Sequence, residues 1–246
     1  FVAAQGLEPV LDQIDDLDEA GRHADALALL ERSLPDARSD AERAELHWRA
    51  ARVHVGMGDD LLERGATEAE LLALFEEGEA HADWAIAAAP DLHLGYYWKS
   101  ASIGKWGQTR GVLNALGAAG RMRQLLREVI DRAPEFAPTY YVLGSMYEQL
   151  PGFPLSFGNT DWAVSFGRRA IDLREADLES GEVEEVRPDY YTELAKHLHK
   201  RNWSQARRER EQRRKRDRAQ NERRGLELPA LYEGEVDIPA LTDREE

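Results

Sequence analysis

Helical stretches interrupted by proline and glycine are the feature that most constrains how this sequence can fold. In each stretch, apolar residues recur at helical spacing, which predicts a helix with one buried face. The first three stretches cover residues 7–19, 24–34 and 41–62. Gly21 breaks the first, and Pro35, Pro90 and Pro134 end later ones because proline cannot continue a helix. No segment alternates with the period of a strand, so the sequence predicts one helix pair after another.

The same signals predict the later helices. Thr67 is the expected N-cap of a helix ending at Ala89, with Glu70 in the capping-box position. The next helix starts near Asp91 and is expected to stop at Gly104–Gly107, which would make Ile103–Gly120 an insertion. The remaining expected helices cover residues 121–133, 137–149, 161–173 (capped by Asn159 or Thr160) and 188–224.

One helix pair carries a known repeat pattern. The spacing of the first helix of a tetratricopeptide repeat (TPR) is met by Tyr140, Leu143, Gly144 and Tyr147, and that of the second by Ala163 and Ala170. Gly144 would let the second helix approach closely. The sequence therefore predicts an all-α, TPR-like α-solenoid of about four helical hairpins plus a long C-terminal helix, with an ordinary helical bundle as the alternative.

Charge divides the C-terminal part of the chain. The net charge of the whole chain is −15, but residues 200–224 hold twelve Lys or Arg and four acidic residues. We therefore predict a repeat domain over 1–175, a capping and basic helix over 176–224, and an acidic, disordered tail over 225–246. We expect the basic helix to dock on an acidic surface of this or a neighbouring subunit. Binding of nucleic acid or of an acidic membrane is the less favoured alternative.

No catalytic pattern is present. The chain has no cysteine, and its seven histidines are scattered. His47 and His54 lie seven residues apart and could share a helix face, but nothing nearby in the sequence completes a zinc site. Motifs for zinc proteases, nucleophilic serine, phosphate loops and dinucleotides are missing. We expect no enzyme activity, no cofactor and no metal.

Two stretches resemble known families. Residues 96–107 (Tyr-Tyr-Trp-Lys-Ser-Ala-Ser-Ile-Gly-Lys-Trp-Gly), and Tyr141–Gly144 with Pro151–Pro154, resemble bacterial TPR proteins of the TRAP-transporter T-component type. They also look like spirochaetal periplasmic TPR lipoproteins, and the eukaryotic regulator of microtubule dynamics proteins share a similar helical arrangement. The sequence departs from the T-component pattern at Ser156–Asn159.

The T-component resemblance implies an exported, lipid-anchored protein. It would form a homo-oligomer and bind a periplasmic solute-binding protein that delivers small organic acids. Phe1–Ala4 would then be the end of a removed export segment. A cytoplasmic location is the alternative.

The candidate binding residues are aromatic, cationic or polar side chains near the insertion and the proline-rich loop. They are Tyr97, Lys99, Lys105, Trp106, Arg110, Tyr141, Glu148, Phe153, Phe157 and Asn159. In a repeat of this kind Tyr97 and Tyr141 would face the concave groove, and an aromatic groove with cations suits a peptide or an anionic ligand. Packing of the same aromatics between helices is the alternative.

These observations predict a non-catalytic binding protein. It would engage a protein partner or a small anionic or hydrophobic ligand, most concretely as the transporter-associated component. A cytoplasmic peptide-binding adaptor and a nucleic-acid-associated protein are the alternatives.

Overall fold

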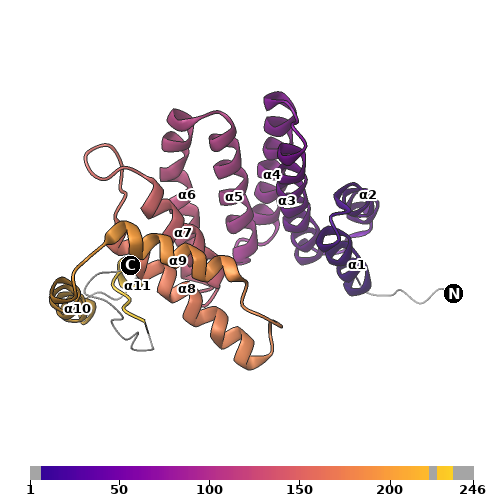
Figure 1. Ribbon diagram of the computed structural model, residues 1–246. Coiled ribbons are helices and arrows are strands. Elements are labelled where there is room, and N and C mark those ends of the chain that lie inside the picture. Colours follow the sequence, from indigo (N-terminus) through magenta and orange to yellow (C-terminus); the bar gives the residue numbers. More distant parts are fainter. Residues whose placement is uncertain (1–6, 222–225, 235–246) are drawn as a thin grey trace. The chain divides into compact units, whose positions relative to one another are not determined.

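The computed structural model describes residues 7–221 and 226–234, and all its secondary structure there is helical (Figure 1). Contacts divide the chain into two compact units, residues 1–132 and 133–246, named unit 1 and unit 2. Unit 1 contains α1 (Glu8–Glu19), α2 (His23–Ser33), the 3-10 helix η1 (Leu34–Asp36), α3 (Asp40–Glu63), α4 (Glu68–Ala88), α5 (His93–Thr109) and α6 (Val112–Arg132). Unit 2 contains α7 (Ala137–Gln149), α8 (Thr160–Ser180), α9 (Pro188–Arg201), α10 (Gln205–Ala219) and α11 (Glu227–Ala230).

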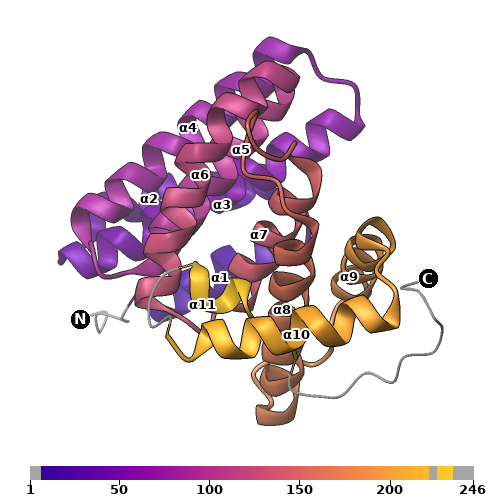
Figure 2. The same ribbon diagram turned by 90° about the vertical axis from the view of Figure 1, so that its left-hand side faces the viewer.

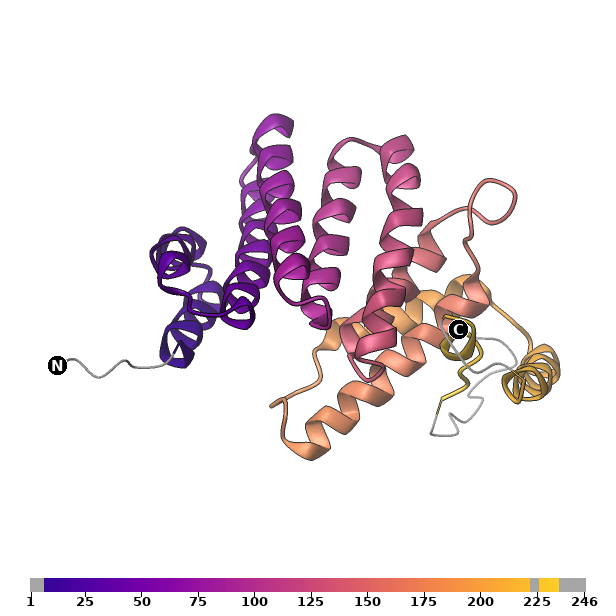
Figure 3. The ribbon, with the colours of Figure 1, turned by 180° about the vertical axis from the view of Figure 1, so that it is seen from behind.

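Consecutive helices pack as hairpins. In unit 1, α1 contacts α2, α3 contacts α4 and α5 contacts α6, and Figure 3 shows the last four helices standing side by side in chain order. In unit 2, α7 contacts α8, which also contacts α9. The predicted all-α fold with about four helical hairpins is confirmed. The predicted boundaries after residues 175 and 224 stay predictions.

Local signals at two helix starts act as expected. The Thr67 hydroxyl accepts from the Glu70 amide while the Glu70 carboxylate accepts from the Thr67 amide, so the capping box is complete. Asn159 is the N-cap of α8, and its side-chain oxygen accepts from the amides of Asp161 (3.0 Å) and Trp162 (3.2 Å).

The predicted break at Gly104–Gly107 is wrong. Helix α5 continues to Thr109, and the turn occurs at Gly111, whose φ of 93° is readily adopted only by glycine. A Cβ at Gly104 would lie 2.7 Å from Met122 Cε, and one at Gly107 would lie 3.1 Å from Ala118 Cβ. The two glycines therefore let α6 approach closely, and the expected insertion extends both helices.

The hairpin α7–α8 packs as its spacing predicts. Tyr140, Leu143 and Tyr147 are buried on α7, and Ala163 and Ala170 are buried on α8. A Cβ on Gly144 would lie 3.3 Å from the Ala163 carbonyl oxygen, so the absence of a side chain permits the close approach.

The long helix expected over 188–224 is wrong as a single element. Helix α9 ends at Arg201, and the next residue, Asn202, adopts the left-handed conformation (φ 44°, ψ 51°). Helix α10 starts after the extended residue Ser204. Asparagine tolerates this conformation better than most residues, so it ends the helix in place of glycine. Figure 2 shows α10 running across α8.

Part of the acidic tail expected to be disordered is folded. Residues 226–234 contain α11, which packs on α8 with Leu226, Ala230 and Leu231 buried. Burial of these three apolar side chains stabilises the folded segment, whereas the acidic charge of the tail had suggested disorder. Residues 235–246 of the predicted tail and Phe1–Ala4 lie outside the described residues.

Candidate functional site

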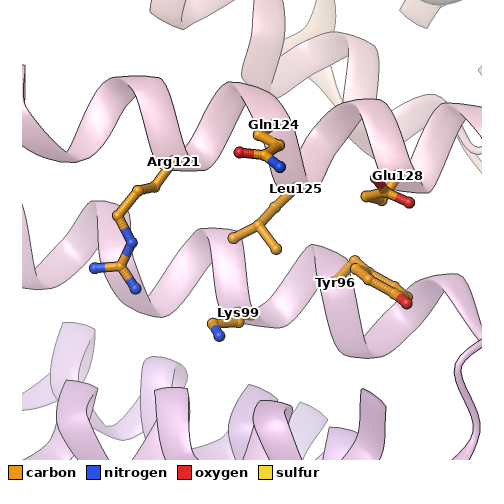
Figure 4. Close-up of a pocket in the computed structure, with 6 residues that line it drawn as sticks. All are labelled: Tyr96, Lys99, Arg121, Gln124, Leu125 and Glu128. Carbon is orange, nitrogen blue, oxygen red and sulfur yellow. The ribbon is translucent and has the colours of Figure 1, made fainter. Parts of the chain in front are cut away.

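An open pocket of about 410 Å³ lies on unit 1 between α5 and α6. Six side chains line it and face one another across the two helices (Figure 4): Tyr96, Lys99, Arg121, Gln124, Leu125 and Glu128. Leu125 gives it an apolar floor between cations at one end and Tyr96 and Glu128 at the other.

The cations of this pocket are held by carboxylates of α4. Lys99 Nζ lies 2.5 Å from Asp83 Oδ1, and Arg121 Nη2 lies 2.7 Å from Glu79 Oε1. An anionic ligand would have to displace these carboxylates, which weakens the case for the predicted anion site.

Three other candidate residues at or next to the end of α5 also meet carboxylates. Lys105 Nζ lies 2.6 Å from Asp59 Oδ1 of α3. Trp106 Nε1 donates to Glu76 (3.0 Å), and Arg110 pairs with Glu68 at 3.5 Å. The Tyr97 ring lies edge-on to Trp98, with centroids 5.2 Å apart. The acidic row of α4, defined as Glu68, Glu76, Glu79 and Asp83, thus faces the cations and indole of α5 and α6.

In unit 2, helix α9 covers the two candidate residues of α7. The Tyr141 ring lies 4.8 Å from that of Tyr190. The Glu148 carboxylate is 2.9 Å from His197 Nδ1, and the Lys200 ammonium is 2.5 Å from the Glu148 carbonyl oxygen. The face expected to be an open groove is therefore occupied by a helix of the same chain.

The loop between α7 and α8 separates the residues that the sequence grouped together. Phe153 is 94% exposed, whereas the Phe157 ring packs 5.1 Å from the Tyr147 ring. Asn159 serves as the cap of α8. Of the three loop candidates, only Phe153 presents its side chain fully to solvent.

The basic helix α10 has an inner face that docks on unit 2. Lys215 is 6% exposed, and its ammonium lies 2.8 Å from Asp161 Oδ1, 2.7 Å from Ser165 Oγ and 3.1 Å from Glu233 Oε1. Arg201, at the end of α9, reaches the same Asp161 carboxylate at 2.7 Å. A buried cation held by three oxygens fixes α10 against the start of α8.

Six arginines of α10 are exposed, and the surface that they form is called the outer face of α10. The exposed arginines of this face are Arg207, Arg210, Arg213, Arg214, Arg216 and Arg218. Some have local partners: Arg210 and Arg214 pair with Glu211, and the Arg207 guanidinium lies 4.3 Å from the Trp203 ring centre. These exposed pairs are weak, because water and salt screen them, so the face remains available to a partner.

Comparison with known families decides between the resemblances seen in the sequence. The model of the family Regulator of microtubule dynamics protein 1-3 matches residues 10–148, more than half of the chain. This chain belongs to that family. A comparison with curated proteins found no match. The regulator of microtubule dynamics match covers α1 to α7 nearly completely and leaves α8 to α11 outside it.

Membership of this family corrects three predictions. The TRAP-transporter T-component assignment is wrong, and the periplasmic lipoprotein character and solute-binding partner drawn from it have no further support. The TPR label is wrong too, since the matching model is not that of a TPR family. The helix lengths support this correction. Helices α3 and α4 have 24 and 21 residues, and together they are longer than one TPR of about 34 residues. The coarser prediction, a binding protein, stands. No helix within 7–221 or 226–234 is long and apolar enough to cross a membrane.

Two side-chain clusters were missed in the sequence. In unit 1, His81 of α4 joins His47 and His54 of α3: His47 Nδ1 is 3.0 Å from His81 Nδ1, and the His54 and His81 rings stack at 5.4 Å. Burial, helped by the neighbouring His54 and His47, lowers the pKa of His81 to about 4. The seven-residue spacing of His47 and His54 was a signal, but the helix that completes the cluster was not foreseen.

In unit 2, Glu193 and His197 are buried on α9 beside Glu148. Burial lowers the pKa of His197, although its hydrogen bond to Glu148 opposes that change. Desolvation acts to raise the pKa of Glu193, but hydrogen bonds from Ser145 and Lys196 outweigh it, so this pKa is lowered. The four-residue spacing of Glu193 and His197 on a predicted helix was the available signal.

Proposed function

We propose that this chain is a non-catalytic binding protein that engages an acidic protein surface through the outer face of α10. The observation that carries the proposal is the division of α10 into two faces. Lys215 anchors the inner face through Asp161, while six arginines of the outer face stay exposed. Guanidinium groups on a fixed helix match carboxylates in paired geometry, so such a face suits an acidic polypeptide.

An acidic protein fits this chain better than a nucleic acid. Apart from residues 200–224 and the acidic tail, the chain is strongly acidic, and the net charge of the whole is −15. A nucleic acid carries negative charge along its entire length and would be repelled wherever it extends past α10. An acidic patch of limited size on a protein avoids that repulsion.

The matching family supplies the partner to test first. Its members are described as regulators of microtubule dynamics. By this likeness, we propose that the acidic partner is a microtubule and that α10 is the part of the chain that contacts it. The proposal goes beyond the family match, because α10 lies outside residues 10–148.

Co-sedimentation of the full chain with stabilised microtubules tests the proposal. The outer-face variant replaces Arg207, Arg213, Arg214 and Arg216 by Gln. A control variant removes the same charge from exposed arginines of unit 1: Arg32, Arg38, Arg64 and Arg127. We expect the outer-face variant to bind about tenfold more weakly, equivalent to about 1.4 kcal/mol, and the control to bind like wild type.

Two results would contradict the proposal. One is an equal loss of binding in both variants, which would show that net charge and not α10 governs association. The other is tighter binding of duplex DNA or RNA than of microtubules, lost in the outer-face variant alone, which would favour the nucleic-acid alternative.

A further inference from the structure

We propose that Glu148, Glu193 and His197 form a binding site for a divalent first-row transition metal, such as Zn²⁺ or Co²⁺, that ties α9 to α7. Each of the three residues offers a ligand atom, and these atoms all lie within 4.8 Å of one another. In the described part of the chain, no other set of three such residues brings its ligand atoms so close.

The backbone presents these ligands from two packed helices. Glu193 and His197 are one turn apart on α9 and therefore project from the same face, and Glu148 comes from the last turn of α7. Side chains on two helices that are already packed lose little freedom on binding, which favours a metal site.

The histidine ring is fixed with one nitrogen toward the carboxylates. His197 is 1% exposed, and its Nδ1 lies 2.9 Å from Glu148 Oε2. The opposite edge of the ring fits against two glycines: a Cβ at Gly144 would lie 2.8 Å from Nε2, and one at Gly167 would lie 3.0 Å from Cδ2. Nδ1 is therefore the nitrogen available as a ligand.

The types of ligand suit a metal of this class. One imidazole and two carboxylates match borderline cations of the zinc class.

Two lysines compete with a metal at this site. Lys196 Nζ lies 3.0 Å from Glu193 Oε2, and Lys200 Nζ lies 3.5 Å from Glu148 Oε1. Their side chains are 61% and 47% exposed, so both ammonium groups can turn into solvent while a dication takes their place. Removing an ammonium should therefore strengthen metal binding.

Titration of the chelator-treated full chain tests the site. Co²⁺ binding is followed by visible absorption, and Zn²⁺ binding by calorimetry. We expect one ion per chain whose Co²⁺ spectrum disappears on addition of Zn²⁺. Glu148→Gln and Glu193→Gln should weaken binding at least about tenfold, whereas Glu179→Gln, an exposed acid of α8, should leave it unchanged.

Lys196→Met separates a metal site from a cluster that is only structural, because removing this ammonium strengthens binding only where a metal competes with it. We expect it to tighten metal binding, and circular dichroism checks that every variant is folded. The proposal is overturned if wild type binds no ion, or if Glu193→Gln binds as tightly as wild type, which would place the ion elsewhere, for example at His47 and His81. If Glu193→Gln does not fold, an unchanged or weaker affinity in Lys196→Met overturns it.

Discussion

The ammonium of Lys215 lies 2.8 Å from Asp161 Oδ1 inside unit 2, although Lys215 belongs to the most basic stretch of the chain. The same carboxylate also holds Arg201 at 2.7 Å, so one acidic residue at the start of α8 anchors both α9 and α10. Two cations of the basic stretch are thus structural. The arginines of the outer face are exposed and make only weak local pairs, so they can meet a partner.

Replacing Lys215 by Met should destabilise unit 2 by about 1–3 kcal/mol, since hydrogen bonds from the buried ammonium to three oxygens are lost. Arg201 still pairs with Asp161 in this variant, which limits the cost. Urea unfolding measures the free energy. Arg213→Met removes an exposed charge from the same helix and should change stability by less than about 0.5 kcal/mol. Equal effects would show that α10 is not anchored through Lys215.

Two substitutions of glycine by alanine should change the free energy of unfolding in opposite directions. A Cβ at Gly144 would lie 2.8 Å from His197 Nε2 and 3.3 Å from the Ala163 carbonyl oxygen, so Gly144→Ala should cost about 1–3 kcal/mol through overpacking. Gly117 of α6 is exposed, with no heavy atom within 4 Å of the same position. Gly117→Ala should therefore stabilise the chain by about 0.5–1 kcal/mol. A stabilising Gly144→Ala in thermal unfolding would contradict the close packing of α7, α8 and α9.

Stability should fall as the solution is acidified from pH 6.5 toward pH 4. Burial, together with the neighbouring His54 and His47, lowers the pKa of His81 to about 4 in the folded chain, from 6.5 for an ordinary histidine. Between pH 4 and pH 6.5 the unfolded chain binds a proton at His81 that the folded chain does not bind, so protonation favours the unfolded chain. The free energy of unfolding is therefore unaffected by His81 above pH 6.5 and falls as the pH drops from 6.5 toward 4.

Urea unfolding at several pH values measures this dependence. His81→Gln should make the free energy of unfolding fall less steeply with acid, whereas Gln at the exposed His199 should leave the slope unchanged. An unchanged slope in His81→Gln would show that this ring is not a source of the acid sensitivity.

The two phenylalanines of the loop between α7 and α8 should differ in importance for stability. Phe153→Ser should change the free energy of unfolding by less than about 0.5 kcal/mol, because the ring is 94% exposed. Phe157→Ser should cost about 1–3 kcal/mol, because its ring packs on Tyr147. Denaturant unfolding of the two variants compares them directly, and equal costs would contradict the packing of Phe157.

The features predicted correctly from sequence depend on residues close together in the chain. The capping box at Thr67 spans one helical turn, and the spacing of Tyr140, Leu143 and Gly144 lies within one helix. The error at Gly104–Gly107 has a different origin. Glycine in α5 is favoured by its contact with Met122 of α6, which no local pattern reveals.

The sequence shows which residues share the helix at the candidate site, but it does not show which carboxylates they pair with. The sequence indicates that Lys99, Lys105 and Trp106 lie together on one helix. Their partners Asp83, Asp59 and Glu76 lie 16, 46 and 30 residues earlier in the chain, so only the folded hairpins show that these groups are already paired. For the same reason, the third histidine beside His47 and His54 was not foreseen. Docking of the basic helix on acidic residues was expected, but the sequence did not show that Asp161 and Glu233 would hold Lys215.

Hydrogen–deuterium exchange of the full chain, alone and bound to microtubules, tests most directly that the outer face of α10 is the binding surface. We expect binding to slow exchange in peptides covering residues 205–219 and to leave those covering α4 and α5 unchanged. Protection over residues 68–109 with no change in α10 would contradict it.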